Sequence, residues 1–210
     1  MNFGGFKFEL WKIHSFREAI PLIMMLLLGA ALFTLIILFM RGRRTRAHAL
    51  AKIEKRLARL SHGKGRFADV AADAGPEANP ACDAVFAAGN ALVLIKVFWW
   101  GLFATGETEG KTWEILDNKK RETVKNPLTA LLAKCKGAEG YLRERKMPVT
   151  VLPLIVFADN YGRPQLKLPL SAKAIIFGNL KKWYRLNVPK PNKTDNPDAI
   201  LDAVKPVFTK

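Results

Sequence analysis

Acidic residues and cysteines are scarce in this 210-residue chain. Only 18 side chains are acidic against 34 that are basic, which gives a formal net charge of +16. An excess of this size predicts a polyanionic neighbour, either nucleic acid or an anionic membrane surface. The two cysteines, Cys82 and Cys135, are too few for a disulfide-rich secreted scaffold, and they lack the histidine partners of a zinc site.

Histidines and phosphate-binding glycine loops are missing from the part of the chain that should form a core. His14, His48 and His62 all precede that part, so no histidine is expected to carry acid–base chemistry there. Gly63-Lys64-Gly65 does not have the spacing of a Walker loop and is interpreted as a linker. Apolar residues make up 50% of the chain, which excludes a wholly disordered protein.

Charge is absent from residues 19–40, which form a long apolar run. Twenty-two helical residues reach about 33 Å, enough to cross a hydrocarbon core of about 30 Å. The run exceeds the h-region of a signal peptide and ends directly in Arg41 rather than in a small-residue cleavage site. We therefore expect a transmembrane helix over residues 19–41, after a short extracytoplasmic N-terminus over residues 1–18.

Basic residues cluster on the C-terminal side of this run. The segment from Arg41 to Arg66 has ten basic side chains and one acid, whereas the first eighteen residues have three and two. The positive-inside rule then predicts a cytosolic C-terminal domain. Four cations are expected to lie next to lipid headgroups: Arg41, Arg43, Arg44 and Arg46.

The remaining chain divides by composition. Apolar residues at helical spacing from Leu50 to Leu60 predict a basic juxtamembrane helix, which together with a linker covers residues 42–65. A folded domain is expected over residues 66–188. A loop-like tail over residues 189–210 should contain one short helix that ends near Val204, before Pro206.

Within the domain, the hydrophobic pattern predicts an α/β fold with the order αβββαβ and a mixed sheet. The three strands are expected at residues 82–88, 91–98 and 111–116, and the fourth at residues 149–157, where Pro153 suggests a sheet edge or a bulge. Residues 91–98 are almost wholly apolar and should be central. Asn126-Pro127 predicts the start of the helix between the third and fourth strands.

Three features in this order resemble the nuclease-related domain family (NERD) of the restriction-endonuclease-like PD-(D/E)xK superfamily. Asp83 precedes a glycine turn and an apolar strand, that strand ends in Phe98-Trp99-Trp100-Gly101, and Trp113 leads to Asn126-Pro127-Leu128. The resemblance covers roughly residues 50–185. It implies a restriction-endonuclease-like domain in which paired carboxylates hold a magnesium ion beside the scissile phosphate.

The expected Glu-x-Lys triplet of that family is incomplete. Alignment on the lysine puts Leu94-Ile95-Lys96 at the triplet, and alignment on Gly101 puts Ile95-Lys96-Val97 there. Neither supplies a carboxylate, so Asp83 and Lys96 are left as vestigial catalytic candidates, with Asp83 as a weak metal ligand. Displaced acids that could complete the site are Glu107 and Glu109, or Asp69 and Asp73.

Two short segments of the sequence are rich in basic residues, and the second also contains aromatic residues. Nucleic-acid interfaces often combine these two kinds of side chain. The candidate nucleic-acid-binding residues are Lys119, Lys120, Arg121, Lys181, Lys182, Trp183 and Arg185. For Trp183 and its neighbours, a helix with a buried tryptophan and solvated lysines remains the alternative.

Three functions follow as hypotheses. The first is a membrane-anchored, catalytically impaired nuclease-like domain that binds DNA, RNA or a protein partner at the bacterial inner membrane. The second is an active magnesium-dependent nuclease with a relocated carboxylate. The third is a structural component of a conjugation or secretion complex in the membrane.

Overall fold

A computed structural model of the chain describes residues 16–42, 45–71, 80–117, 120–158, 164–190 and 196–208. The chain forms two compact units, residues 1–42 and residues 43–210, and each is described by itself. The predicted divisions after residues 65 and 188 fall inside the second unit, because the segments on both sides of them pack into the same two cores.

The first unit contains one helix, α1 (Phe16–Gly42). Its segment Ile20–Leu38 is long and apolar enough to cross a membrane, and none of this segment is buried within the chain. Thr34 donates its hydroxyl to the carbonyl of Ala30 at 2.8 Å, so this polar group is satisfied inside the helix. These properties agree with the predicted membrane span by length and composition.

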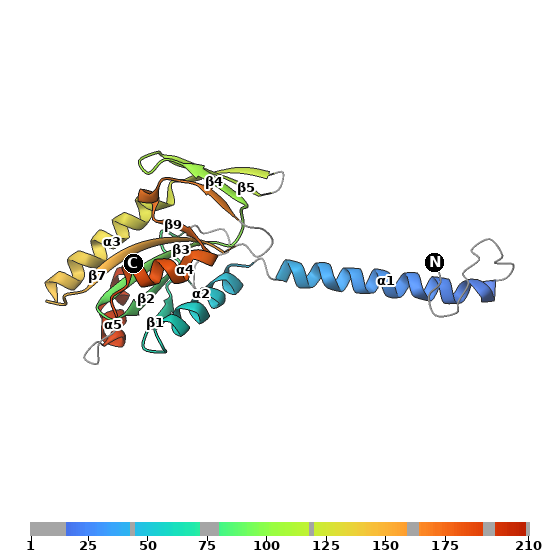
Figure 1. The fold of residues 1–210 in the computed structure, drawn as a ribbon, viewed down its shortest axis with the longest axis horizontal. Coiled ribbons are helices and arrows are strands. Elements are labelled where there is room, and N and C mark those ends of the chain that lie inside the picture. The colour runs from blue at the N-terminus through green and yellow to red at the C-terminus, as the bar shows by residue number, and fades with distance from the viewer. Residues whose placement is uncertain are drawn as a thin grey trace. The chain divides into compact units, whose positions relative to one another are not determined.

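A five-stranded mixed sheet forms the centre of the second unit, in the order β1-β2-β3-β7-β9 (Figure 1). The strands are β1 (Arg66–Asp69), β2 (Ala84–Ala88), β3 (Ala91–Phe98), β7 (Thr150–Phe157) and β9 (Ala174–Ile176). Antiparallel pairing joins β1, β2 and β3, and parallel pairing joins β3, β7 and β9. Gly89, at φ +59°, makes the two-residue turn between β2 and β3. The apolar strand β3 is central, as predicted.

Pro153 lies within β7 without a bulge, which corrects part of the prediction. It faces Leu94 of β3 in regular parallel register. Ile155 donates its N–H to Lys173 on the side of β9, and Pro153, two residues earlier, points its nitrogen the same way. Pairing with β9 covers only Ile155–Phe157, so the missing N–H of Pro153 falls at a local edge of the sheet.

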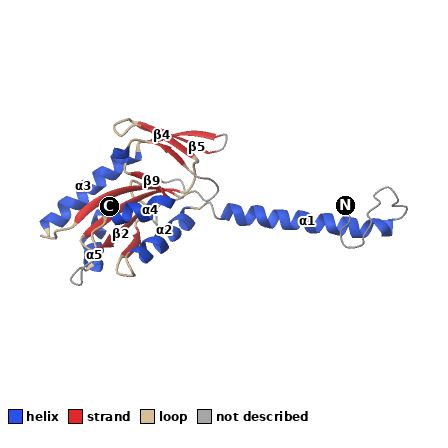
Figure 2. Ribbon diagram, in the orientation of Figure 1, coloured by secondary structure: helices blue, strands red, loops and turns tan. Residues whose placement is uncertain are grey.

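Helices cover both faces of this sheet (Figure 2). On one face lie α2 (Arg46–Leu60) and α4 (Leu180–Asn187), the latter preceded by the 3₁₀ turn η2 (Phe177–Asn179). On the other face lie α3 (Pro127–Glu144) and α5 (Pro197–Phe208). The predicted last helix was too short, because α5 continues through Pro206 to Phe208 and packs against α3.

A second sheet has the order β6-β5-β4-β8; β4 to β6 lie between β3 and α3 in the chain, and β8 follows β7. Its strands are β4 (Phe103–Gly106), β5 (Thr112–Asp117), β6 (Lys120–Lys125) and β8 (Gln165–Lys167), and a 3₁₀ turn, η1 (Leu170–Ala172), follows β8. The predicted third strand, residues 111–116, is therefore β5 of this second sheet. It cannot join the first sheet beside β3, because β2 and β7 occupy both edges of β3. The predicted αβββαβ order is therefore incomplete, because β1 precedes the predicted strands and β4, β5 and β6 stand between β3 and α3; the mixed α/β architecture is as predicted.

Candidate functional site

Asp83 lies just before β2, and its side chain is only 1% exposed. Its backbone N–H donates to the carbonyl of Ile95 at 2.8 Å, and its Oδ2 accepts the N–H of Val97 at 2.8 Å. The carboxylate thus accepts a backbone hydrogen bond at the end of the paired region of β2 and β3. A buried carboxylate requires cationic or hydrogen-bonding partners, because burial alone destabilises its charge.

Lys96 is the first cationic partner of Asp83. Its Nζ lies 3.4 Å from Oδ2 of Asp83 and donates to the carbonyl of Pro80 at 2.7 Å. The residue is 4% exposed. Burial lowers the pKa of Lys96, and the attraction of Asp83 offsets only part of this effect. The structure therefore brings together the two residues that the sequence singled out, Asp83 just before β2 and Lys96 on the neighbouring β3.

Arg46 is the second cationic partner, and it comes from the first turn of α2. Its Nε donates to Oδ1 of Asp83 at 3.0 Å, and its Nη2 donates to the backbone carbonyl of Asp83 at 3.1 Å. The same guanidinium contacts Asp69 at 2.6 and 3.1 Å. Burial acts to lower the pKa of Arg46, but the hydrogen bonds to the two aspartates outweigh it and the pKa is raised.

This position corrects the prediction that Arg46 lies with the lipid-facing cations. Thr45 caps α2 by accepting the N–H of His48, which fixes the first turn and the Arg46 side chain over the end of β2. Arg43 and Arg44 lie outside the described residues, as does the side chain of Arg41.

A pocket of about 160 Å³ opens beside the Asp83 carboxylate. Its lining combines the two site residues, an aromatic rim and one additional acid, and comprises Pro80, Asp83, Lys96, Val97, Phe98, Trp99, Trp100, Glu122 and Val124. Glu122 comes from β6 of the second sheet. No motif pointed to Glu122, because β6 was not predicted and only the folding of the second sheet brings it to this pocket.

The arrangement around Asp83 does not fit a divalent cation. Both carboxylate oxygens already accept hydrogen bonds, and the Arg46 guanidinium and the Lys96 Nζ lie within 3.4 Å of them. Among the described residues, no group of three or more His, Cys, Asp or Glu side chains could hold a metal ion. In this geometry the Arg46 guanidinium lies between Asp69 and Asp83, where it neutralises both carboxylates.

The other candidate acids lie elsewhere. Glu107 and Glu109 are exposed in the turn between β4 and β5, and Asp73 lies outside the described residues. Asn126 holds that turn, since its Nδ2 donates to the carbonyls of Thr108 and Gly110. Its Oδ1 accepts the N–H of Leu128, which caps α3 as predicted. The Asn-Pro-Leu motif therefore has a structural role.

The two predicted nucleic-acid clusters lie on different elements. Lys120 and Arg121 are exposed on β6, and Lys119 falls outside the described residues. The other cluster lies on α4, where Lys181, Lys182 and Arg185 are exposed and Trp183 is half-buried. They do not form one continuous set of residues in the chain or one element of the fold.

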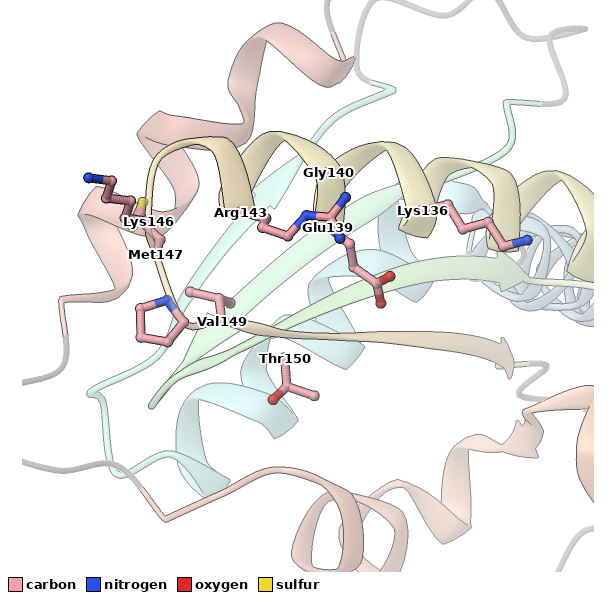
Figure 3. A pocket seen from close by; sticks show the side chains of 9 residues that line it. Lys136, Glu139, Gly140, Arg143, Lys146, Met147, Val149 and Thr150 are labelled. Carbon is pink, nitrogen blue, oxygen red and sulfur yellow. The ribbon is translucent and has the colours of Figure 1, made fainter.

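A hollow of about 790 Å³ lies between α3 and the start of β7 (Figure 3). Lys136, Arg143 and Lys146 line it together with Glu139. Arg143 is in the last turn of α3, where a cation stabilises the carbonyl end of the helix, so its presence has an ordinary structural explanation.

A scan of the chain against protein-family models finds no match, and comparisons with curated proteins and with solved structures find none either. The described residues form a mixed α/β fold together with one apolar helix, α1, that is long enough to cross a membrane.

Proposed function

We propose that the chain is a membrane-anchored, nuclease-like domain of the NERD type that does not cleave phosphodiesters and acts as a binding module. The observation that carries this proposal is the occupancy of Asp83: Arg46 and Lys96 already neutralise the carboxylate that a nuclease would use to hold its metal. The first sheet and its helices support a restriction-endonuclease-like core, since α2, β1 to β3, α3 and β7 follow one another in the chain with only β4 to β6 inserted after β3.

The chemical consequence concerns charge. Cleavage of a phosphodiester adds negative charge to the attacking and leaving oxygens, and a bound metal ion stabilises that charge and lowers the pKa of its water. Arg46 and Lys96 offer positive charge, but neither can activate water in this way. With Arg46 and Lys96 beside Asp83, the pocket is suited to stabilising the fold or binding a partner rather than to hydrolysing a phosphodiester.

Purified full-length chain in mild detergent is expected to show no magnesium- or manganese-dependent cleavage of DNA or RNA. Single- and double-stranded substrates with end labels provide the measurement, with Asp83→Asn as the matched variant that keeps the shape of the side chain. Metal-dependent turnover that Asp83→Asn abolishes would overturn the proposal.

The second candidate function is an active nuclease with a relocated carboxylate. Glu122 favours it, because this acid lines the same pocket as Asp83 and Lys96. Among the described residues, the exposed Glu107 and Glu109 form no hydrogen bond or ion pair with Asp83 and its two cations, so Glu122 replaces them as the acid to test. If turnover occurs, Glu122→Gln is the variant that identifies this mechanism.

The anchor is assigned to α1, with the second unit in the cytosol at the bacterial inner membrane. Ten basic side chains follow the apolar segment between Arg41 and Arg66, and cytoplasmic flanks are enriched in such residues. Reporter enzymes fused to each end are expected to be active in the cytosol at the C-terminus and in the periplasm at the N-terminus. A periplasmic C-terminal reporter would contradict this topology.

The bound partner is proposed to be an anionic surface, nucleic acid or a protein of a membrane complex. Lys120 and Arg121 make only long contacts with Glu122 and Glu114, at 3.5 and 3.8 Å, and these exposed pairs contribute little to stability. Both cations can exchange these partners for phosphates. Membership of a conjugation or secretion complex would be supported by copurification with the membrane proteins of such a complex.

A further inference from the structure

Two helices place cations side by side over one face of the first sheet. The basic helical face is defined here by its cationic residues, which are Lys52, Lys55, Arg56 and Arg59 of α2 and Lys181, Lys182 and Arg185 of α4. Leu50, Ile53 and Leu57 of α2 pack into the same core as Leu180 and Tyr184 of α4. The Nζ of Lys52 lies 4.4 Å from the ring centroid of Phe177, immediately before α4, so the cationic side of α2 is turned toward α4.

This face has a strong charge imbalance. The seven cations are opposed by one acid on the two helices, Glu54 of α2, and α4 contains no acid at all. Lys55, Arg59, Lys181, Lys182 and Arg185 are exposed. Because like charges on a surface repel one another, such a concentration favours contact with a polyanion.

An apolar side chain projects from the same short helix. Leu186 of α4 is 74% exposed, and Trp183, three residues earlier on the same helix, is half-buried. Helices that lie on membranes combine cations with leucine and tryptophan in this way, because the cations contact headgroups while the apolar groups enter the acyl boundary. Contact with phosphates of nucleic acid would leave Leu186 without a comparable environment.

We infer that the basic helical face docks on anionic phospholipid headgroups. This inference rests on the proposed role of α1 as an anchor and deepens the proposed function by naming the anionic partner. The N-cap of α2, Thr45, follows the last residue of α1, Gly42, by three positions. Because this tether is short, the bilayer surface has a high effective concentration near α2. A free polyanion would have to exceed that concentration to compete for the basic helical face.

The test uses full-length chain reconstituted into vesicles of phosphatidylcholine, with or without about 30% phosphatidylglycerol, a content chosen to give an anionic surface. An environment-sensitive fluorophore is attached at Leu186→Cys. The native thiols do not compete for the label, because Cys82 and Cys135 are buried and burial raises the pKa of each to about 12. A blue shift that occurs only in anionic vesicles and is reversed by salt is the expected result.

The discriminating variant replaces Lys55, Arg59 and Lys182 with glutamine. It is expected to lower the ratio of docked to undocked domain on the order of 100-fold, since each basic residue near an anionic bilayer strengthens binding about fivefold. Lys136, Arg143 and Lys146, all exposed, form the matched control, because the same substitutions there remove two lysines and one arginine from the hollow beside α3. The control variant is expected to keep the blue shift.

Three results would overturn the inference. The first is equal emission in neutral and anionic vesicles, and the second is an equal loss of signal in the control variant. The third is a blue shift in neutral vesicles that requires an added oligonucleotide and is lost in the Lys55, Arg59 and Lys182 variant. That result would assign the basic helical face to nucleic acid. Flotation of the chain with neutral vesicles reports the anchor separately, so a failed anchor and a failed docking face are distinguishable.

Discussion

Replacing Arg46 with alanine is expected to lower the free energy of unfolding of the second unit by about 3–5 kcal/mol. The size follows from the penalty for leaving a buried charge without its partner, and Asp83 is 1% exposed. Lys96 remains beside Asp83 in this variant, so part of the charge is still neutralised, but the hydrogen bonds from Arg46 Nε and Nη2 are lost. Chemical denaturation of full-length chain in detergent gives the measurement.

Arg66→Ala is the matched control for this variant. Arg66 also pairs with an aspartate, Asp198, at 2.9 Å, but both side chains are about half exposed, so its removal is expected to cost less than about 1 kcal/mol. An equal loss of unfolding free energy in Arg46→Ala and Arg66→Ala would show that the buried contacts of Asp83 with Arg46 and Lys96 have no special energetic role.

The Arg46→Ala variant also tests whether the Arg46 guanidinium occupies the place of a metal ion. Its guanidinium contacts both Asp69 and Asp83, so its removal leaves two carboxylates that face a shared space. Manganese or magnesium at millimolar concentration is then expected to raise the Tm of Arg46→Ala more than that of the unmodified chain, because a ligand that binds only the folded state stabilises it. A Tm that does not respond to either metal would argue against a former cation site.

Glutamate at position 94 is expected to create metal-dependent stability, whereas glutamate at position 95 is not. Side chains alternate along β3, so Leu94 shares the face of Lys96 and Ile95 faces the opposite core. Leu94 lies opposite Val85, two residues along β2 from Asp83. The structure therefore selects Leu94-Ile95-Lys96 over Ile95-Lys96-Val97 as the register in which a carboxylate would meet Asp83.

Both substitutions should destabilise the fold by several kcal/mol without metal, since each position is 0% exposed and an unpartnered carboxylate would be buried there. Only Leu94→Glu should recover Tm when manganese is added, and Ile95→Glu serves as its control because burial and chemistry are the same. Recovery of both variants, or of neither, would mean that the face of β3 does not determine cation binding and would contradict the proposed relation to nucleases.

Much of the architecture could be predicted from local patterns. The uncharged run over residues 19–40 indicated α1, the unbroken apolar run over residues 91–98 indicated a central strand, and Asn126-Pro127 gave the start of α3. These features depend on neighbouring residues alone, through hydropathy, periodicity and capping. The approximate range of β7 followed from the same information.

Arg46 shows most clearly what the sequence did not determine. In sequence it belongs to a run of cations after an apolar segment, so the local pattern grouped it with Arg41, Arg43 and Arg44. Its contact with Asp83 spans 37 positions, and Glu122 reaches the same pocket from a second sheet. Residues 111–116 likewise had the pattern of a strand, but no local signal said which sheet that strand would join.

The amino-acid sequence by itself determined the apolar helix, the α/β class, Asp83 and Lys96 as candidate site residues, and the absence of a carboxylate at positions 94 and 95. Only the tertiary structure decided that β7 occupies the second edge of β3, that Arg46 neutralises Asp83, and that the cations of α2 and α4 share one face. The physical reason is the range of the interactions. Hydropathy and capping act within a few residues, whereas edge pairing and burial of charge depend on segments that meet only when the chain has folded.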